Sequence, residues 1–327
     1  MITWPIASNP IRISGCDSKV YICVSKFRMS GYKVWIAAAR LRTLPLAFAS
    51  IILGSLLAYS RASFDIWVFL LSILTTLCYQ VLSNYANDYG DGVKGTDADR
   101  IGEARATASG LISVAAMRKA VVLFSVLSVL FGTTLSFYAC RDLGFYYQLA
   151  FTLLGLLATW AAISYTVGDK AYGYSGLGDV FVLLFFGIVG VGGSYYLQTG
   201  TWDYSILLPA GSLGFLAMAV LNLNNMRDRE GDARSGKNTL ALKLGERGAK
   251  GYHFLLVIGA FDLAFLYNRI HPTTNWQNLY FLTLPLLFLN LKKVLKASRP
   301  LDYEPLLKQM ALTTLFFALL FGLGKAI

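Results

Sequence analysis

The chain has 327 residues, of which 56% are hydrophobic and only 14% are charged, and its formal net charge is +11. About 25% of the residues of an ordinary soluble domain are charged, so this composition excludes a disordered protein and a typical water-soluble enzyme. Apolar runs of about 20 residues follow one another, and each is long enough to cross a hydrocarbon core. We therefore expect an all-α, polytopic membrane protein that is embedded in a lipid bilayer.

The hydrophobic pattern predicts nine transmembrane helices. In chain order they lie near residues 43–60, 65–86, 114–139, 146–167, 177–198, 205–224, 252–268, 276–291 and 309–324. Of the 29 Lys and Arg residues, four lie in residues 1–28. Another 21 lie between residue 29 and the first span or in the loops after spans two, four, six and eight, and four lie on the other side. The positive-inside rule makes the basic side cytoplasmic, in what we take to be the cell inner membrane. The same rule accounts for the net charge, so we expect no nucleic-acid partner.

The first 28 residues differ from the rest of the chain. They contain four basic residues but no continuous apolar run, which argues against a signal peptide. We expect residues 1–28 to be an N-terminal extension, either disordered or a wrongly assigned start before Met29. Residues 29–327 are expected to form one transmembrane domain.

The acidic residues are concentrated in two segments. Nine of the 18 lie in residues 88–103 or 228–246, which we expect to be loops that directly follow spans two and six. At the start of the first segment, Asn84, Asp88 and Asp91 are spaced i, i+4 and i+7. This spacing places all three on one face of a helix at the end of span two.

The second segment repeats this arrangement. Asn224, Asp228 and Asp232 are spaced i, i+4 and i+8 at the end of span six, which runs in the same direction as span two. Carboxylates that face each other repel unless cations lie between them, and carboxylate and amide oxygens suit Mg²⁺. The alternative, that these carboxylates only neutralise nearby Lys and Arg, is less favoured for two matching clusters than for one. We therefore predict a Mg²⁺ site between the two clusters.

Basic side chains suited to phosphate surround both clusters. Lys94, Arg100 and Arg105 follow the first cluster, and Arg227 and Lys237 belong to the second. An acidic floor with a basic rim is the composition expected of a diphosphate site. Because no Walker-type glycine loop is present, a nucleoside triphosphate is not indicated.

These motifs resemble those of the UbiA superfamily of intramembrane prenyltransferases. The resemblance rests mainly on residues 84–91 and 224–232 and covers about residues 33–327. Within the superfamily, residues 91–97 and 172–179 are similar to the branch that prenylates 1,4-dihydroxy-2-naphthoate in menaquinone synthesis.

The resemblance implies nine helices around a central cavity, with the active site at its cytoplasmic mouth. It implies Mg²⁺ that joins the Asp clusters to the diphosphate of a polyprenyl donor. The metal ligands expected on this basis are Asp88, Asp91, Asp228 and Asp232, together with Asn224.

The resemblance also implies catalytic roles for Asn84, Tyr165 and Lys170. Asp179 lies at the cytoplasmic start of span five, where a carboxylate is costly and usually functional, so we expect a catalytic role for it as well. Arg40 lies just before the first span, where we expect it either to bind the carboxylate of the aromatic acceptor or to extend to the membrane interface.

The expected reaction transfers a polyprenyl group from an all-trans polyprenyl diphosphate to 1,4-dihydroxy-2-naphthoate, with loss of diphosphate and CO₂, giving demethylmenaquinone. One alternative is prenylation of another aromatic acceptor such as 4-hydroxybenzoate. A CDP-alcohol phosphotransferase is less favoured, because Gly95 and Thr96 stand where that family has Ala and Arg. A membrane transporter is also less favoured, since it would place ionisable groups at mid-membrane.

Overall fold

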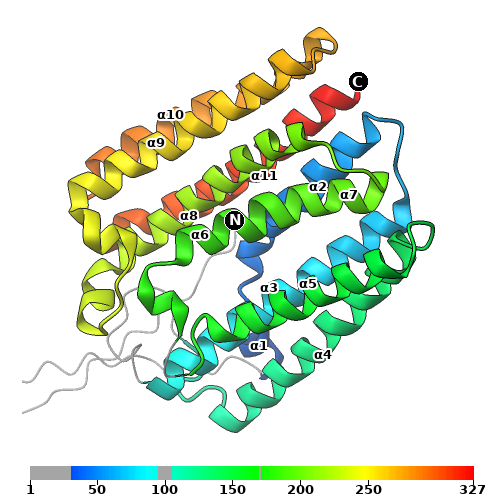
Figure 1. Cartoon of the computed structure of the whole chain (residues 1–327). Helices are drawn as coiled ribbons and strands as arrows, with labels where there is room; N and C mark the ends of the chain where they lie inside the picture. Colours follow the sequence, from blue (N-terminus) through cyan, green and yellow to red (C-terminus); the bar gives the residue numbers. More distant parts are fainter. Residues whose placement is uncertain (1–30, 95–104, 169–170) are drawn as a thin grey trace, which may run out of the picture.

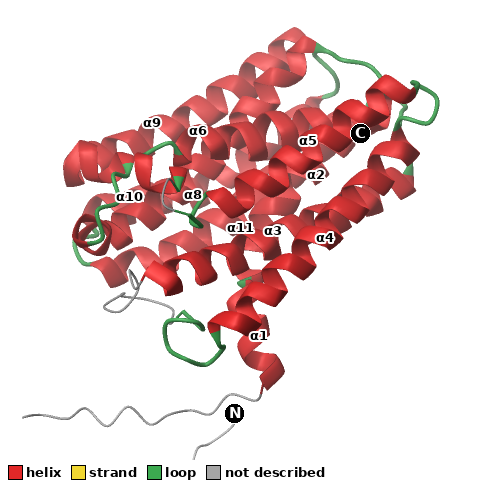
Figure 2. Ribbon diagram, turned by 60° about the horizontal axis from the view of Figure 1, so that its bottom comes forward, coloured by secondary structure: helices red, strands yellow, loops and turns green. Residues whose placement is uncertain are grey.

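The computed structural model describes residues 31–94, 105–168 and 171–327, and the expected extension at residues 1–28 lies outside them. Within the described ranges the secondary structure is helical and contains no strand (Figures 1 and 2). Nine helices in these ranges are long and apolar enough to cross a membrane. The predicted all-α class and the predicted number of spans are therefore confirmed.

The elements follow one another in a simple order. The first half consists of α1 (Gly31–Ala39), η1 (Leu41–Thr43), α2 (Leu44–Tyr59), α3 (Ile66–Lys94), α4 (Val114–Ala139) and α5 (Phe145–Ser164). The middle consists of η2 (Tyr172–Ser175), α6 (Gly178–Val182), the π-helix η3 (Leu183–Gly193) and α7 (Ser194–Thr199). The remainder consists of η4 (Tyr204–Ile206), α8 (Leu207–Arg234), α9 (Leu240–Ile270), η5 (Asn275–Thr283), α10 (Leu284–Lys296) and α11 (Pro300–Ala326).

Several helices extend beyond the apolar runs that predicted them. Helix α3 continues to Lys94, α8 continues to Arg234, and α9 begins at Leu240, with a kink at Gly245, where φ is 66°. Hydropathy marks only the part of a helix that crosses lipid, whereas the backbone hydrogen bonds continue through polar turns beyond it. The acidic motifs therefore lie on the last helical turns of α3 and α8, as their spacing predicted, and the loops after them begin later than hydropathy indicated.

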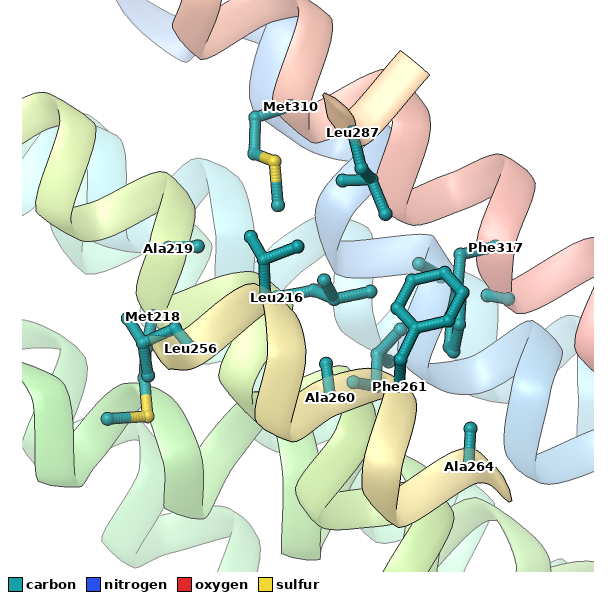
Figure 3. Close-up of a cluster of buried hydrophobic side chains, with 14 of the residues drawn as sticks. Leu216, Met218, Ala219, Leu256, Ala260, Phe261, Ala264, Leu287, Met310 and Phe317 are labelled. Carbon is teal, nitrogen blue, oxygen red and sulfur yellow. The ribbon is translucent and has the colours of Figure 1, made fainter. Parts of the chain in front are cut away.

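Helix α8 forms the centre of the bundle. It is the most deeply buried span in the described part of the chain, and it packs against α9, α11 and η3. Figure 3 shows this core, in which the rings of Phe261 and Phe317 meet edge to face with their centroids 5.4 Å apart. Ala219 of α8 and Ala260 of α9 are small residues of the same buried cluster. Small side chains let helices approach closely in lipid, where apolar surface alone does not drive association.

A second hydrophobic cluster supports the end of α3. Leu82 and Ala86 of α3 pack with Met117 of α4 and with Ala106 and Ile112 from the segment between these helices. This packing holds the segment at residues 105–113 against the last turns of α3. Helix α4 then begins after Ser113, whose side chain accepts the backbone N–H of Ala116.

The ends of α3 and α8 lie at the same end of the bundle. Both helices run toward it, and η2 and the start of α9 lie there as well (Figure 1). Because α3 and α8 are parallel, their two Asn–Asp motifs come to the same depth, as the sequence predicted.

Candidate active site

Asp91 is the point at which the segments of the site meet. Its carboxylate is only 1% exposed and accepts hydrogen bonds from Arg105 Nη2 at 3.0 Å and from the Tyr174 hydroxyl at 2.9 Å. The Lys237 ammonium lies 3.6 Å from Asp91 Oδ1 and 3.8 Å from Asp232 Oδ1. One cation therefore bridges a carboxylate of α3 and a carboxylate of α8.

Asp88 binds backbone groups, unlike Asp91, which contacts side chains. Its two carboxylate oxygens accept the backbone N–H groups of Ala106 and Thr107, at 3.0 and 2.9 Å. These bonds fasten the segment after α3 back onto the helix. The approach depends on Gly92, because a Cβ atom there would lie 2.7 Å from Cγ2 of Thr107. Asp88 thus organises the segment that supplies Arg105.

The second motif is built around Arg227. This guanidinium binds both oxygens of Asp228, with Nε and Nη2 at 2.7 and 2.8 Å, and Nη2 also donates to Asn224 Oδ1 at 2.7 Å. Its third nitrogen, Nη1, donates to Glu304 of α11 at 2.5 Å. Glu304 also pairs with Arg42 of η1. Asn224 and Asp228, both predicted metal ligands, are therefore bound by an arginine in this structure.

Tyr174 of η2 brings the predicted basic residues together. The ammonium groups of Lys94 and Lys237 lie 4.2 and 5.0 Å from its ring centroid, while its hydroxyl donates to Asp91. The backbone carbonyl of Tyr174 accepts the N–H of Asn238 at 2.9 Å, which fixes η2 beside the segment that carries Lys237. A cation over an aromatic face is stabilised by the ring quadrupole.

An aromatic row begins beside this polar centre. The Tyr165 and Tyr172 rings meet edge to face at 5.3 Å, and Tyr172 stacks on Phe181 at 4.0 Å. Phe185 continues the row along η3, with its ring centroid 6.1 Å from that of Phe181. The row leads from the end of the bundle along a membrane-spanning element.

Tyr165 is a neutral phenol at the edge of the site. Burial raises its pKa to about 12, and the negative charges of Asp232, Asp179 and Asp91 act in the same direction. At working pH its hydroxyl therefore keeps its proton. Asp179, which begins α6, is buried and accepts a hydrogen bond from the Tyr252 hydroxyl at 3.0 Å.

Arg40 forms the break between α1 and η1, and Asn84 of α3 binds the residues around it. The Asn84 amide donates to the Ala39 carbonyl at 2.8 Å and to Thr43 Oγ1 at 3.3 Å. Arg40 occupies the left-handed region, with φ 50° and ψ 53°. Non-glycine residues rarely adopt this conformation, which is often found at functional sites.

The structure thus brings most of the predicted residues to one end of the bundle. Two predicted residues, Arg100 and Lys170, lie outside the described residues. Sequence reasoning missed several contributors, among them Arg42, Phe181, Tyr252 and Glu304. Glu304 carried a signal, since it is a carboxylate in the first turns of an apolar helix, but nothing in its spacing linked it to the two motifs.

The carboxylates fit a divalent cation, although no group of three or more His, Cys, Asp and Glu side chains among the described residues is arranged to hold one. Lys237 already places a positive charge between Asp91 and Asp232. The donors at this point are carboxylate oxygens, which are the ligands that Mg²⁺ prefers. Asp91 and Asp232 are therefore the residues best placed to share a cation.

Comparison with known proteins gives consistent matches. The sequence model of the UbiA prenyltransferase family matches residues 47–322. The chain is 46% identical to a 1,4-dihydroxy-2-naphthoate octaprenyltransferase of Haemophilus influenzae, over 90% of this chain and 96% of that protein. It is 43% identical to the Escherichia coli protein of the same name, over 91% of this chain and 96% of the relative.

Solved structures share the fold at low sequence identity. A UbiA homolog from Aeropyrum pernix superposes with a TM-score of 0.65 at 15% identity, covering 87% of this chain and 97% of its own. A UbiA homolog from Archaeoglobus fulgidus, solved with GPP and Mg²⁺, superposes with a TM-score of 0.58 at 16% identity, covering 86% and 99%.

Proposed function

Because this chain belongs to the UbiA prenyltransferase family, we propose that it prenylates 1,4-dihydroxy-2-naphthoate with a polyprenyl diphosphate. The reaction releases diphosphate and CO₂ and gives demethylmenaquinone, first in its quinol form. The protein is a Mg²⁺-dependent aromatic prenyltransferase of the membrane. The observation that carries this proposal is the match to the naphthoate enzymes over nearly the whole of both chains.

The donor diphosphate binds at the end of the bundle where Lys237 lies between Asp91 of α3 and Asp232 of α8. Lys94, Lys237 and Arg105 supply positive charge there, and their contacts with Tyr174 and Asp91 hold these groups in place. Asp91 and Asp232 are the residues that would hold Mg²⁺. When bound, this ion neutralises charge that develops on the leaving diphosphate.

The aromatic row protects the allylic cation that forms when the carbon–oxygen bond of the donor breaks. Tyr165, Tyr172 and Phe181 present ring faces and edges beside the polar centre. Aromatic faces stabilise a cation, and an apolar lining excludes the water that would capture it as an alcohol. Because Tyr165 keeps its proton, its hydroxyl is a hydrogen-bond donor and not a base.

The acceptor ring attacks the allylic carbon through the carbon that bears its carboxylate. A carbon–carbon bond forms, and the ring becomes non-aromatic. Loss of CO₂ returns the electron pair of the broken carbon–carboxylate bond to the ring and restores aromaticity. Arg40, held in its strained conformation at the start of η1, is the residue that we assign to the acceptor carboxylate.

The described helices make the chain a multi-pass membrane protein. We place it in the cell inner membrane with the site facing the cytoplasm. Lys94, Arg105, Arg227 and Lys237 all lie at the end of the bundle that carries the site, which agrees with the positive-inside rule.

A product assay tests this assignment. The purified protein receives Mg²⁺ and a defined polyprenyl diphosphate, with either 1,4-dihydroxy-2-naphthoate or 4-hydroxybenzoate, and the products are identified by mass. We expect a prenylated naphthoquinol that has lost CO₂, and diphosphate release that depends on the naphthoate. Prenylated hydroxybenzoate that retains its carboxylate, without reaction of the naphthoate, would refute the acceptor and leave prenyl transfer standing.

A further inference from the structure

Arg227 was predicted to bind phosphate, but in the structure its guanidinium is bound by three side chains of the protein. Its side chain is 3% exposed, and each of its three guanidinium nitrogens donates to a side chain. Two nitrogens hold Asp228, one of these also holds Asn224, and the third holds Glu304. Asp228 and Asn224 are neighbours of Arg227 on α8, whereas Glu304 comes from α11.

This arrangement competes with metal binding by the second motif. Each oxygen of Asp228 already accepts a hydrogen bond from the Arg227 guanidinium, so this buried positive charge and a cation compete for the same carboxylate. If Asp228 and Asn224 turn to a cation, Arg227 loses the acceptors of its Nε and Nη2 groups. A buried guanidinium without a paired carboxylate is costly, so a second carboxylate must remain in contact with it.

Glu304 is placed to be that second carboxylate. It accepts a hydrogen bond from Nη1 of Arg227, whereas Asp228 and Asn224 are bound by Nε and Nη2. The bond to Glu304 can therefore remain when Asp228 leaves. It also pairs with Arg42 of η1, and the side chains of Glu304 and Arg42 are 30% and 38% exposed. The pair connects α11 to the start of the first span, beside the site.

We propose that Glu304 is a positioning residue that retains Arg227 and Arg42 while Asp228 exchanges Arg227 for the cation that accompanies the donor. The Nε and Nη2 groups of Arg227 that this exchange frees then face the diphosphate. This inference rests on the proposed function, because it assumes that the cation enters with a prenyl diphosphate. It assigns a role to a residue of α11 that neither acidic motif contains.

The test measures binding of the donor without turnover. A prenyl thiolodiphosphate, whose carbon–sulfur bond resists ionisation, is titrated into the full-length protein by calorimetry at a series of Mg²⁺ concentrations. In the Glu304→Gln variant Arg227 has lost its alternative carboxylate and holds Asp228 more firmly. We expect the Mg²⁺ concentration for half-maximal binding to rise about tenfold, while kcat at saturating Mg²⁺ changes less than about threefold.

Three variants separate positioning from a merely structural role. Glu246→Gln removes a nearby carboxylate that pairs with Arg229 and Lys250 rather than with Arg227, and should keep the wild-type Mg²⁺ dependence. Glu304→Asp keeps the charge and should lie between the wild type and Glu304→Gln, and it also serves if Glu304→Gln fails to fold. In an Asp228→Asn background, Glu304→Gln should cause no further shift, because the exchanging carboxylate is already absent.

The inference is overturned if Glu304→Gln keeps the wild-type Mg²⁺ dependence. It is also overturned if Glu246→Gln shows the same shift, or if the shift persists unchanged in the Asp228→Asn background. Failure of the proposed function would look different. In that case the wild-type protein would form no prenylated naphthoate from an intact donor, whatever the Mg²⁺ dependence of analogue binding.

Discussion

The four aspartates of the two acidic motifs make different contacts in this site. Asp91 and Asp232 face a common ammonium group, whereas Asp88 holds two backbone N–H groups and Asp228 holds an arginine. The spacing of the motifs predicts one equivalent role for all four carboxylates. In this structure the contacts divide them instead into Asp91 and Asp232, which face a bridging cation, and Asp88 and Asp228, which are held by the protein. Asp228 would join the first pair through the exchange proposed above.

Replacing Asp232 by Asn tests the first kind of residue. The change keeps the side-chain volume and removes the charge that faces Lys237, so we expect turnover to fall at least about a hundredfold while the protein stays folded. Product formation by mass and the melting temperature in detergent would measure both effects. Near-normal activity at saturating Mg²⁺ would contradict a cation site shared between α3 and α8.

Asp88→Asn is the matched comparison, and it should behave differently. The amide can accept only through its oxygen, so one of the N–H groups of Ala106 and Thr107 loses its acceptor. We expect the free energy of unfolding to fall by about 1–3 kcal/mol, in addition to a loss of activity. Unchanged thermal stability would show that Asp88 does not anchor this segment.

Tyr165→Phe tests the protonation state of the phenol. The pKa of Tyr165 lies near 12, above its ordinary value of 10, so the hydroxyl stays protonated as pH rises through the working range. Removing it should lower kcat by about tenfold, through loss of a hydrogen-bond donor, and leave the shape of the pH–rate profile unchanged. Loss of a titration limb between about pH 7 and 10 would indicate that this tyrosine acts as a base.

At the scale of elements, periodicity predicts what lies along one helix and fails for contacts between segments. The i, i+4 and i+7 spacing correctly places Asn84, Asp88 and Asp91 on helical turns, and the parallel direction of α3 and α8 follows from the count of spans. The fold-back of the segment at residues 105–107 and the approach of Glu304 depend on tertiary packing. No regular pattern in the sequence encodes them.

Gly92→Ala tests the packing of that segment against α3. The new Cβ would lie 2.7 Å from Cγ2 and 2.9 Å from Cβ of Thr107, so the segment must move. We expect a loss of about 1–3 kcal/mol in the free energy of unfolding, together with lower activity.

Gly231→Ala on α8 is the control for this substitution. A Cβ atom there would have nothing within 4 Å. Helix propensity alone should then stabilise the protein by about 0.5–1 kcal/mol. Equal effects of the two substitutions on thermal stability would exclude the close approach at Gly92 as their cause.

At the scale of the whole molecule, the fold separates two chemical environments along its length. One end of the bundle carries the two acidic motifs, η2 and the basic side chains of Lys94, Arg105, Arg227 and Lys237. Between the ends, the helices turn small and apolar residues toward one another around α8. A donor with a charged head and a long apolar tail matches this division, because the diphosphate and the prenyl chain need opposite surroundings.

The direction of the molecule in the membrane can be tested with two positions on a single span. Tyr204 of η4 is 79% exposed and begins the span that continues into α8, whereas Glu230 is exposed near the other end of that span, beside the acidic motif. About 26 residues of helix at 1.5 Å each place them about 39 Å apart, on opposite sides of a bilayer.

In a variant without its four native cysteines, Tyr204→Cys should react with a membrane-impermeant maleimide added to intact spheroplasts. Glu230→Cys should react only after the membrane is permeabilised. This pattern follows from the positive-inside rule, because the basic residues cluster at the Glu230 end. The reverse pattern would place the diphosphate site outside the cytoplasm and would contradict the proposed supply of the donor from that side.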